Sequence, residues 1–580
     1  MSDIKDFSDS DLFLNRELSQ LEFNFRVLAQ AQDPAIPLLE RLKYLCISCT
    51  NLDEFFEIRA ATVKTALQYK APLLPDNMDP QLALDKIYLL SNRLVKAQYA
   101  LWNDVLRPEL AAAGVRILDR ANWNATQRRW LHHYFKTEVL PILSPLALDP
   151  AHPFPQILNK SLNVAVVLDG KDAFGRRGGI AIVRAPRSLP RIIQLPESVS
   201  GGRDDFAFLS AMLSEFVGDL LPGMKVKGAY QFRVTRNSEL FVDEEEVENL
   251  ASALKDELHS RGYNPAVRLE IAKDCPNRIV QVLLENFNLS VNAVSRINGP
   301  VNLNRVIQVY DMAKRADLKF PNFKQGRTTL DEDDPFGSIR GGDILLHHPY
   351  QSFNDVLDVL QHAASDPHVL AIKQTLYRTG KDSKIIEHLI TAAHNGKDVS
   401  VVVELRARFY EEANLNLANR LQEAGVQVIY GVVGFKTHAK MMLIVRREGK
   451  TLRRYAHLGT GNYHAGTAKV YTDIGLLTCH TGITQDVHSI FQQLSGLSKP
   501  IALKHLLTSP FTLHASLLKK IKREEKNASD GKKGHIIAKM NAINEPDVIK
   551  ALYAASQAGV TIELIVRGAC CLRPGVPGLS

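Results

Sequence analysis

At 580 residues the chain is too long for a single hydrophobic core, so several domains are expected. Hydrophobic residues make up 45% and charged residues 23% of the sequence, as in an ordinary soluble globular protein. No apolar run approaches the ~18 residues of a membrane span, and six cysteines in this length do not make a disulfide framework, which fits a reducing cytoplasm.

The formal net charge is +8, with a pI of about 9.0. This excess of positive charge indicates a polyanionic partner or peripheral association with an anionic membrane surface. Charge alone does not choose among the possible polyanions.

Residues 1–110 are expected to form a helical domain. Apolar residues recur there at helical spacing in two runs: Leu18, Leu21, Phe25 and Leu28, then Leu38, Leu42 and Leu45. Cys46 and Cys49 form a CxxC pair inside this pattern. Without a second pair, we expect a packing role for it rather than a redox or metal role.

Residues 111–324 predict a mixed α+β domain. Short β-rich runs at 162–168, 180–183 and 240–242 alternate with helical stretches. Residues 316–335 are polar, charged and rich in turn formers, which is typical of a linker.

Residues 325–505 predict an α/β domain with a largely covered sheet. Strands are expected at 369–376, 399–405, 426–433 and 439–445, and helices at 384–395 and 413–424.

A weak internal repeat relates this domain to residues 506–580. The segment SKIIEHLITAAHNGKDVSVVVELRA, from Ser383, resembles PDVIKALYAASQAGVTIELIVRGA, from Pro546. One offset of 163 residues pairs Ile386 with Ile549 and Gly396 with Gly559. The alternative is coincidence between two generic helix–glycine–strand units. If the repeat is a duplication, residues 506–580 start a second, incomplete lobe, and we expect them to be poorly anchored.

The central chemical motif is Thr437-His438-Ala439-Lys440, followed by Gly459-Thr460-Gly461-Asn462. If residues 438–440 lie in a strand, His438 and Lys440 point to the same side. A neutral imidazole can attack phosphorus while an ammonium offsets charge on the phosphate oxygens. The glycine loop, with Gly461 and Asn462, lets backbone N–H groups come close to phosphate.

Two arginines follow predicted strands, where open α/β sheets build their ligand sites: Arg378 and Arg408. A guanidinium can grip two phosphate oxygens. Surface ion pairs are the alternative for both. Arg406 would share the face of Arg408 if the strand continued.

The histidine motif with the glycine loop resembles that of the phospholipase D superfamily, and the wider sequence resembles the bacterial polyphosphate kinases of the first type. Matches to that family's pattern run in order along nearly the whole chain: NRELSQLEFNFRVL from Asn15, SCTNLDEFFEIR from Ser48, LLHHPYQSF from Leu345, IKQTLYRT from Ile372, VVVELRARFYEEANL from Val401, THAKMMLI from Thr437, LGTGNYHAGTAKVYTD from Leu458 and IVRGACCLRPGVPG from Ile565.

The resemblance implies a multidomain α/β (α+β overall) architecture. Its parts are a helical N-terminal domain (1–110), a mixed α+β head domain involved in dimerisation (111–324), a first phospholipase D-like catalytic lobe (325–505) and the start of a second (506–580), which we expect to be truncated. The resemblance also implies a cytoplasmic homodimer or homotetramer. It identifies the polyanion as polyphosphate, so no nucleic acid partner is expected.

The implied reaction is reversible transfer of the γ-phosphoryl group of ATP to a polyphosphate chain, with Mg²⁺, through a phosphohistidine at His438. The resemblance places Asn51, Tyr471 and Arg567 on the nucleotide. It associates Arg378 and Arg408 with phosphate and Mg²⁺. An arginine has no lone pair for a metal, so we expect both to grip the phosphates that hold the ion. Transfer of the γ-phosphoryl group leaves ADP as the product.

Two departures from these patterns matter. The phospholipase D pattern has an aspartate where this chain has Val445, and the kinase family usually has tryptophan where this chain has Gln20. The first weakens the main alternative, a phosphodiesterase or nuclease that uses the same histidine. A non-catalytic polyanion-binding protein is a further alternative. Simpler explanations for two of the nucleotide candidates are an N-cap at Asn51 and a half-buried strand tyrosine at Tyr471.

Overall fold

The chain divides into two units, each described here by itself. The computed structural model describes residues 7–69, 75–148, 153–171, 178–240, 250–380, 383–432, 434–496 and 502–580. Unit 1 comprises Met1–Glu239, Ser260–Pro321 and Leu518–Ser580, and unit 2 comprises Leu240–His259 and Asn322–Leu517. Several helices and four sheets give the mixed α/β architecture that the sequence predicts.

Unit 1 begins with the predicted helices: α1 (Arg16–Gln32), α2 (Leu38–Phe55), α3 (Ala61–Tyr69), α4 (Pro80–Ala100) and α5 (Arg107–Ala112). Asn15 caps α1, because its side-chain oxygen accepts hydrogen bonds from the backbone N–H groups of Glu17 and Leu18. Asp79 caps α4 in the same way, with Pro80 in the first turn, where its missing N–H removes no helix bond.

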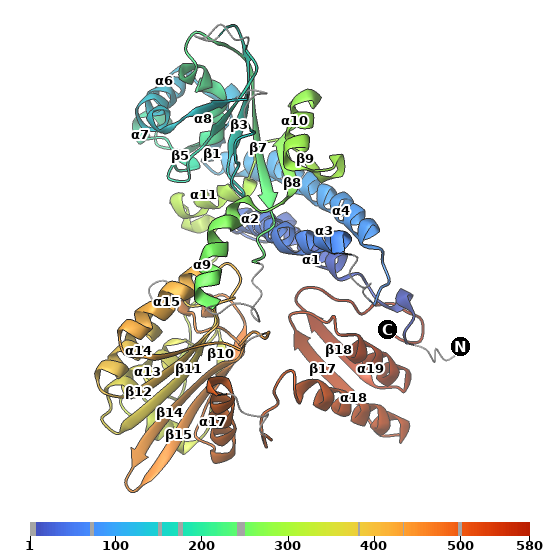
Figure 1. Ribbon diagram of the computed structural model, residues 1–580, viewed down its shortest axis with the longest axis vertical. Helices are drawn as coiled ribbons and strands as arrows, with labels where there is room; N and C mark the ends of the chain where they lie inside the picture. Colours follow the sequence, from blue (N-terminus) through green and yellow to red (C-terminus); the bar gives the residue numbers. More distant parts are fainter. Residues whose placement is uncertain are drawn as a thin grey trace. The chain divides into compact units, whose positions relative to one another are not determined.

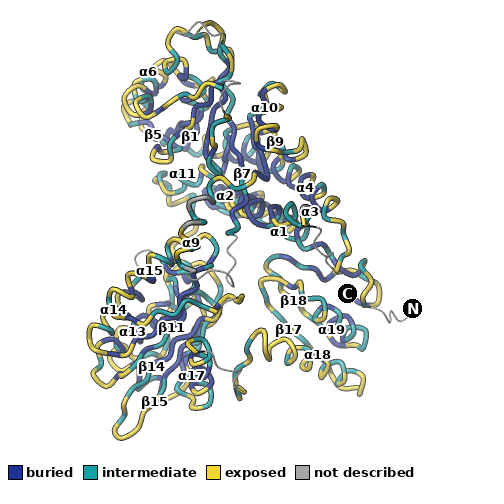
Figure 2. The backbone as a smooth tube through the Cα atoms, viewed as in Figure 1, coloured by how far each residue is buried: buried dark blue, intermediate teal, exposed yellow. Residues whose placement is uncertain are grey.

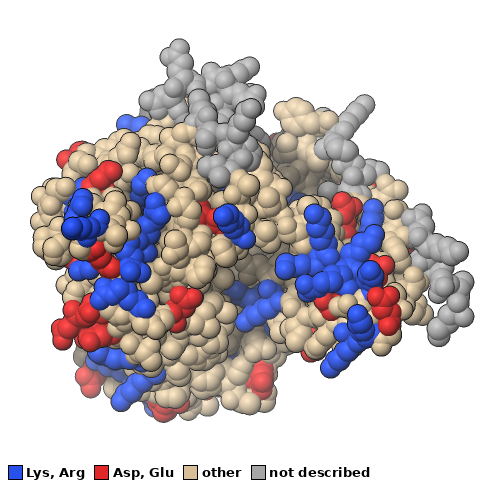
Figure 3. Space-filling view, turned by 90° about the horizontal axis from the view of Figure 1, so that it is seen from below, with Lys and Arg blue, Asp and Glu red and all other residues tan. Residues whose placement is uncertain are grey.

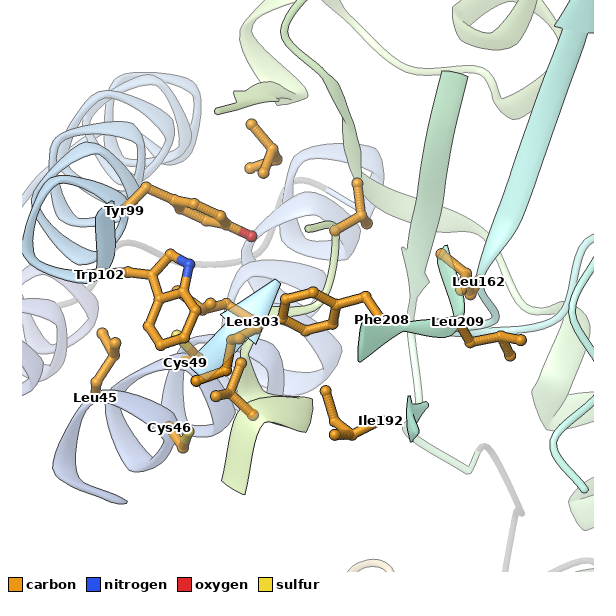
Figure 4. Close-up of a cluster of buried hydrophobic side chains, with 14 of the residues drawn as sticks. Leu45, Cys46, Cys49, Tyr99, Trp102, Leu162, Ile192, Phe208, Leu209 and Leu303 are labelled. Atoms are coloured by element: carbon orange, nitrogen blue, oxygen red, sulfur yellow. The ribbon is translucent and has the colours of Figure 1, made fainter. Parts of the chain in front are cut away.

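The two predicted apolar runs face the core of this helical region. Figure 4 shows Cys46 and Cys49 among Leu45, Trp102 and Leu303. Burial raises the pKa of Cys46 to about 12 and that of Cys49 well above its usual range. Neither thiol forms a thiolate at neutral pH, so the CxxC pair fills space in the core.

Two of the sheets of unit 1 have the strand orders β1-β6-β5 and β2-β4-β3-β7-β8-β9. Their strands are β1 (Val115–Leu118), β2 (Pro145–Ala147), β3 (Asn163–Asp169), β4 (Ile180–Arg184), β5 (Ile192–Gln194), β6 (Asp204–Phe208), β7 (Lys225–Arg236), β8 (Ala266–Ala272) and β9 (Val294–Ile297). The helices of this region are α6 (Ala125–Tyr134), α7 (Glu197–Ser200), α8 (Leu209–Phe216), α10 (Asn277–Phe287) and α11 (Ile307–Met312).

The predicted strands at 162–168 and 180–183 are confirmed as β3 and β4. The strand predicted at 240–242 is wrong for Leu240, which lies outside a strand and packs against the core of unit 2. Residues 241 and 242 lie outside the described residues.

Unit 2 is built on a seven-stranded sheet of order β10-β16-β15-β14-β11-β12-β13 (Figure 1). The strands are β10 (Ile344–His348), β11 (Val369–Leu376), β12 (Asp398–Val403), β13 (Gln427–Tyr430), β14 (Lys440–Glu448), β15 (Thr451–Gly459) and β16 (Asp473–Thr478). The helices are α9 (Leu250–Ser260), α12 (Pro335–Gly341), α13 (Asn354–Ser365), α14 (Lys384–His394), α15 (Glu411–Glu423), α16 (Ala465–Ala468) and α17 (Thr481–Ser495). The predicted strands and helices of this region are confirmed, β11 at its predicted ends. The strand predicted at 426–433 is confirmed as β13, and residue 433 lies outside the described residues.

Both faces of this sheet are covered. Along β14, Met442 and Ile444 join the core with α13 and α14, whereas Met441 and Leu443 join a second core with α17. Figure 2 shows β11 and β14 buried, with exposed residues on the outer helices. The sheet is therefore rigid, and residues at its edges are held in place.

The C-terminal part of unit 1 holds β17 (His535–Met540), α19 (Pro546–Gln557) and β18 (Thr561–Val566). The helix α18 (Leu513–Ser529) belongs to unit 1 from Leu518 onward. We expected poor anchoring here, and that expectation is wrong for residues 518–580. The Tyr553 hydroxyl donates a hydrogen bond to the Leu12 carbonyl (2.9 Å), and the Cys570 N–H donates to Ser19 Oγ (2.8 Å). Residues of the chain's beginning, Leu12 and Phe13, join the core of this part.

No described helix is long and apolar enough to cross a membrane. On the face shown in Figure 3, lysine and arginine side chains gather in groups, with acidic side chains beside several of them.

Candidate active site

The strand ends of unit 2 converge at one edge of its sheet. β11, β12 and β13 run parallel, so their carboxyl ends meet there. β14 runs antiparallel to β11 and starts at this edge with Lys440, opposite Gly459 at the end of β15. β16 also starts here, with Asp473 opposite His348 at the end of β10. The predicted histidine, arginines and glycine loop all adjoin these strand ends.

His438 lies between β13 and β14, outside any strand. The prediction that His438 and Lys440 share one strand face is therefore wrong. β14 begins only at Lys440, because the Ala439 carbonyl accepts a hydrogen bond from the hydroxyl of Thr375 (2.7 Å) instead of a ladder N–H. The His438 ring is exposed and meets the Tyr377 ring edge-on, with 4.7 Å between the ring centroids.

The imidazole of His438 is uncharged at neutral pH. Although the side chain is exposed, neighbouring atoms remove part of its hydration. This desolvation and the positive charges of Lys440, Arg378 and Lys436 lower the pKa of His438 from 6.5 to about 4. An unprotonated ring nitrogen keeps its lone pair available for attack on phosphorus.

Lys440 is buried and supports His438 from behind. Its Nζ donates a hydrogen bond to the His438 carbonyl and lies 5.1 Å from the centroid of the Tyr377 ring. Burial and the charge of Arg378 lower the pKa of Lys440 to about 8, while Asp473 acts in the opposite direction. Lys440 thus remains a cation at neutral pH.

Arg378 and Arg408 lie just past the carboxyl ends of β11 and β12. Arg378 Nη2 donates to the Arg408 carbonyl (3.3 Å), and the guanidinium lies over the Tyr410 ring at 5.2 Å from its centroid. Arg378 Nε is buried and has no hydrogen-bond partner within the described part of the chain. β12 ends before Arg406, so Arg406 and Arg408 do not share a strand face.

Two buried polar residues that the sequence analysis missed hold these loops. The carboxylate of Glu404 accepts hydrogen bonds from the backbone N–H groups of Thr437 (2.7 Å) and Arg406 (2.9 Å). Asn414 Nδ2 donates to the carbonyls of Glu404 (2.8 Å) and Tyr377 (2.7 Å). The acidic residue at the end of the apolar run VVVEL was the available signal, since a buried carboxylate needs hydrogen-bond donors.

The glycine loop packs closely against the carboxylate of Asp473. A Cβ on Gly461 would lie 2.4 Å from Asp473 Oδ2, so only glycine leaves room for that side chain. Asp473 Oδ1 accepts a hydrogen bond from the Thr460 hydroxyl (2.9 Å). Asn462 Oδ1 is buried and has no hydrogen-bond partner within the described residues. Contacts of Gly461 and Asn462 with phosphate remain a prediction.

The two histidines that flank this loop differ from His438. His457 is 2% exposed, its Nδ1 is 2.8 Å from the Tyr463 hydroxyl, and burial with a smaller effect of His348 lowers its pKa to about 3. His464 caps α16, since its Nδ1 accepts a hydrogen bond from the Thr467 N–H (3.1 Å). Burial excludes His457 from solvent, and capping occupies one ring nitrogen of His464.

The three predicted nucleotide contacts lie in different surroundings. Tyr471 is 48% exposed and precedes β16, so the alternative of a half-buried strand tyrosine is wrong. Asn51, in unit 1, lies inside α2, so the N-cap alternative is wrong as well. Arg567, also in unit 1, follows β18 and donates from Nη1 to Asn541 Oδ1 (3.1 Å). Nucleotide binding by all three remains a prediction.

An uncharged histidine among lysine and arginine groups, at the carboxyl edge of an α/β sheet, is the arrangement of an enzyme that acts on phosphate esters or anhydrides. The chain matches four family descriptions in succession: the polyphosphate kinase N-terminal domain (residues 13–118), middle domain (126–309), C-terminal domain 1 (334–500) and C-terminal domain 2 (506–580). It belongs to the polyphosphate kinase family.

Individual relatives agree along almost the whole chain. A polyphosphate kinase from Xylella fastidiosa is 65% identical over 99% of this chain and 82% of its own length. One from Pseudomonas aeruginosa is 53% identical over 99% of this chain and 83% of its own. The crystal structure of polyphosphate kinase from Porphyromonas gingivalis superposes with a TM-score of 0.83 at 30% identity, covering 98% of this chain and 82% of that one. The chain is thus an enzyme of the polyphosphate kinase family.

Proposed function

We propose that the enzyme transfers the γ-phosphoryl group of ATP to polyphosphate through a phosphohistidine at His438. The observation that carries this proposal is an exposed imidazole that stays uncharged beside three cations, Lys440, Arg378 and Lys436. Desolvation, and after it the charges of these cations, keep the ring nitrogen unprotonated, and the cations also attract the phosphates that it must attack.

The chemistry divides into two balanced steps. In the first, an imidazole nitrogen donates its lone pair to the γ-phosphorus, a P–N bond forms, and the P–O bond to ADP breaks with its electrons on the departing oxygen. In the second, a terminal oxygen of the polyphosphate chain attacks the same phosphorus and the P–N bond breaks, which restores the neutral imidazole. Because the P–N bond retains a high transfer potential, the enzyme is also expected to run in reverse, from polyphosphate to ADP.

The surrounding residues position His438 and stabilise the transition state. Lys440 and Arg378 offset the charge that the phosphoryl oxygens carry in the transition state. Glu404, through the Thr437 N–H, holds the segment that presents His438. Removing one stabilising donor of this kind typically costs about 3–4 kcal/mol of activation free energy.

We also propose that ATP is used as its Mg²⁺ complex. Oxygen groups suited to this ion occur at the same edge: the carboxylate of Asp473 and the unpartnered Oδ1 of Asn462. When bound, Mg²⁺ would neutralise phosphate charge. Arg378 and Arg408 would hold the phosphates that carry the ion, since guanidinium groups cannot ligate it.

The test is to label the intact chain with γ-phosphate-labelled ATP and to map the modified residue. We expect an acid-labile label on His438, and its complete loss with polymer synthesis in His438→Ala. His464→Ala is the matched control, because His464 flanks the same edge and should leave the label in place. A phosphoenzyme of normal amount in His438→Ala would overturn the proposal. Cleavage of a phosphodiester without nucleotide would favour the phospholipase D-like alternative instead.

A further inference from the structure

Unit 1 contains a small cavity rich in positive charge. It has a volume of about 220 Å³ and lies between β3, the loop from β4 to β5, the start of α8 and the segment after β9. Four cationic residues line it: Lys160, Arg187, Arg191 and Arg305. None of these belongs to the edge of unit 2 that presents His438.

Among the described residues, the arginines of this cavity lack acidic partners. Lys160 pairs with Glu57 at 2.7 Å, but no carboxylate lies within ion-pair distance of Arg187, Arg191 or Arg305 among the described residues. Burial lowers the pKa of Arg191, and the positive charges of Arg305 and Arg187 lower it further. Burial, and then the charge of Arg233, lower the pKa of Arg305. Asp53 opposes this shift, and Arg187 adds a smaller lowering. The three arginines of the cavity therefore repel one another.

Two guanidinium groups of the cavity are held by backbone carbonyls, and one of their donors has no acceptor among the described residues. Arg187 Nη2 donates to the Asn159 carbonyl (3.0 Å) and Arg191 Nη2 to the Ala185 carbonyl (3.2 Å), which fixes both guanidinium groups. Arg191 Nη1 is buried and has no partner among the described residues. A buried donor without an acceptor is costly, and an anion in the cavity would satisfy it.

Size and walls narrow the choice of ligand. Leu162, Phe208 and Val301 form an apolar floor, and Figure 4 shows Leu162 and Phe208 in the adjoining core. An apolar floor strengthens charge interactions by lowering the local dielectric constant. The volume is below the ~300 Å³ at which pockets for drug-sized ligands begin, which favours a small anion as the ligand.

We propose that this cavity binds a phosphate or diphosphate group, as a second phosphate site built entirely by unit 1. Planar guanidinium forks suit the tetrahedral oxygens of phosphate, and a bound anion would remove the repulsion among the three arginines. The shared chemistry is the phosphate group. Its source is either free pyrophosphate or a segment of the polyphosphate chain.

The test measures binding of pyrophosphate to the full chain by calorimetry. Arg187→Gln and Arg191→Gln each remove one cation, and Arg203→Gln is the matched control, because Arg203 is exposed in the same unit and does not line the cavity. We expect one class of site to weaken by about tenfold or more in each cavity variant and to stay unchanged in Arg203→Gln. Equal affinity in all three variants and the parent chain would overturn the proposal.

Stability without anions separates ligand binding from a structural role. In phosphate-free buffer, Arg191→Gln should unfold at the same temperature as the parent chain or higher, because it relieves repulsion. A lower unfolding temperature together with unchanged pyrophosphate affinity would contradict the proposal. Arg187→Gln, at an exposed residue, gives a second reading should Arg191→Gln fail to fold.

Product analysis then distinguishes the two sources of phosphate. If a chain segment occupies the cavity, Arg187→Gln should shorten the polymer and raise the KM for added polyphosphate, with the KM for ATP unchanged. If free pyrophosphate is the ligand, polymer length should stay constant in Arg187→Gln. Added pyrophosphate should then change the turnover of the parent chain but not that of this variant. These outcomes do not depend on whether His438 is the phosphorylated residue, so the two proposals can fail separately.

Discussion

The units β11–α14–β12 and β17–α19–β18 are two copies of one local design. An offset of 163 residues pairs Ile386 with Ile549. With this offset, the last residue of α14 corresponds to the last residue of α19, and the first and last residues of β12 correspond to those of β18. Even a loop bond repeats: the Glu404 N–H donates to the Leu376 carbonyl at 3.0 Å, and the Arg567 N–H donates to the Met540 carbonyl at 3.0 Å. Such agreement supports a duplicated unit over coincidence.

The surroundings of the two copies differ. β12 is buried at five of its six residues because it lies inside a seven-stranded sheet with helices on both faces. β18 alternates exposed and half-buried residues, because its sheet has two strands and α19 packs on one face. A similar sequence therefore specifies the strand–helix–strand unit, whereas neighbouring elements decide whether both of its faces form a core.

The largest effect should come from one charge placed in both copies. Val402 is 1% exposed, and its counterpart Ile565 is 54% exposed. We expect Val402→Asp to unfold unit 2, since a buried, unpaired carboxylate costs several kcal/mol. Ile565→Asp should change the free energy of unfolding by less than about 1 kcal/mol. Denaturant unfolding of both variants measures the contrast.

Val402→Thr and Ile565→Thr are the matched controls, with a smaller polar change at each position. If Ile565→Asp destabilised the protein as much as Val402→Asp does, the exposed face of β18 would have to be covered in solution. The comparison of the two copies would then fail.

Periodicity predicted most of this architecture. The strand–helix–strand order of residues 369–405, the repeat and the edge that gathers His438, Arg378 and Arg408 all follow from apolar patterns and parallel strand ends. The run VVVEL could have indicated a buried carboxylate at Glu404. Its bond from the Thr437 N–H and the bond from Asn414 to the Tyr377 carbonyl could not be predicted, because the bonded residues are 33 and 37 positions apart in the chain. The Thr375 bond that delays the start of β14 is equally non-local.

The arginines at the edge of the embedded copy should matter for catalysis rather than folding. We expect Arg378→Ala and Arg408→Ala to lower turnover by about a hundredfold or more, as loss of a preorganised donor does, with little change in unfolding temperature. Lysine at either position should restore activity only in part, because an ammonium lacks the planar fork. Full rescue by lysine at both positions, or loss of folded protein in the alanine variants, would point to simple charge or to a structural ion pair.

Glu404 and Arg567 occupy corresponding positions in the two copies, and their amide substitutions should separate positioning from binding. In Glu404→Gln a single side-chain oxygen remains to accept the two N–H bonds, so the His438 segment loosens. We expect phosphoenzyme formation to slow by about tenfold, with the KM for ATP unchanged. Arg567→Gln should instead raise the KM for ATP if Arg567 binds nucleotide. Rapid-quench labelling over a range of ATP concentrations distinguishes these patterns, and an unchanged labelling rate in Glu404→Gln would exclude its positioning role.

The smallest expected effect is the pH dependence of phosphoenzyme formation, which we expect Lys440 to set. Burial and the charge of Arg378 lower the pKa of Lys440 to about 8. Lys440 is therefore a cation below pH 8 and loses its charge above it, so phosphoenzyme formation at low ATP should fall by roughly tenfold per pH unit beyond that point. On the acid side, His438 stays neutral down to about pH 4, so its protonation should not limit the rate above pH 5. Lys440→Arg should flatten the alkaline decline while lowering the plateau, because arginine keeps its charge but fits the buried position less well. An alkaline decline that Lys440→Arg leaves unchanged would show that another group titrates there.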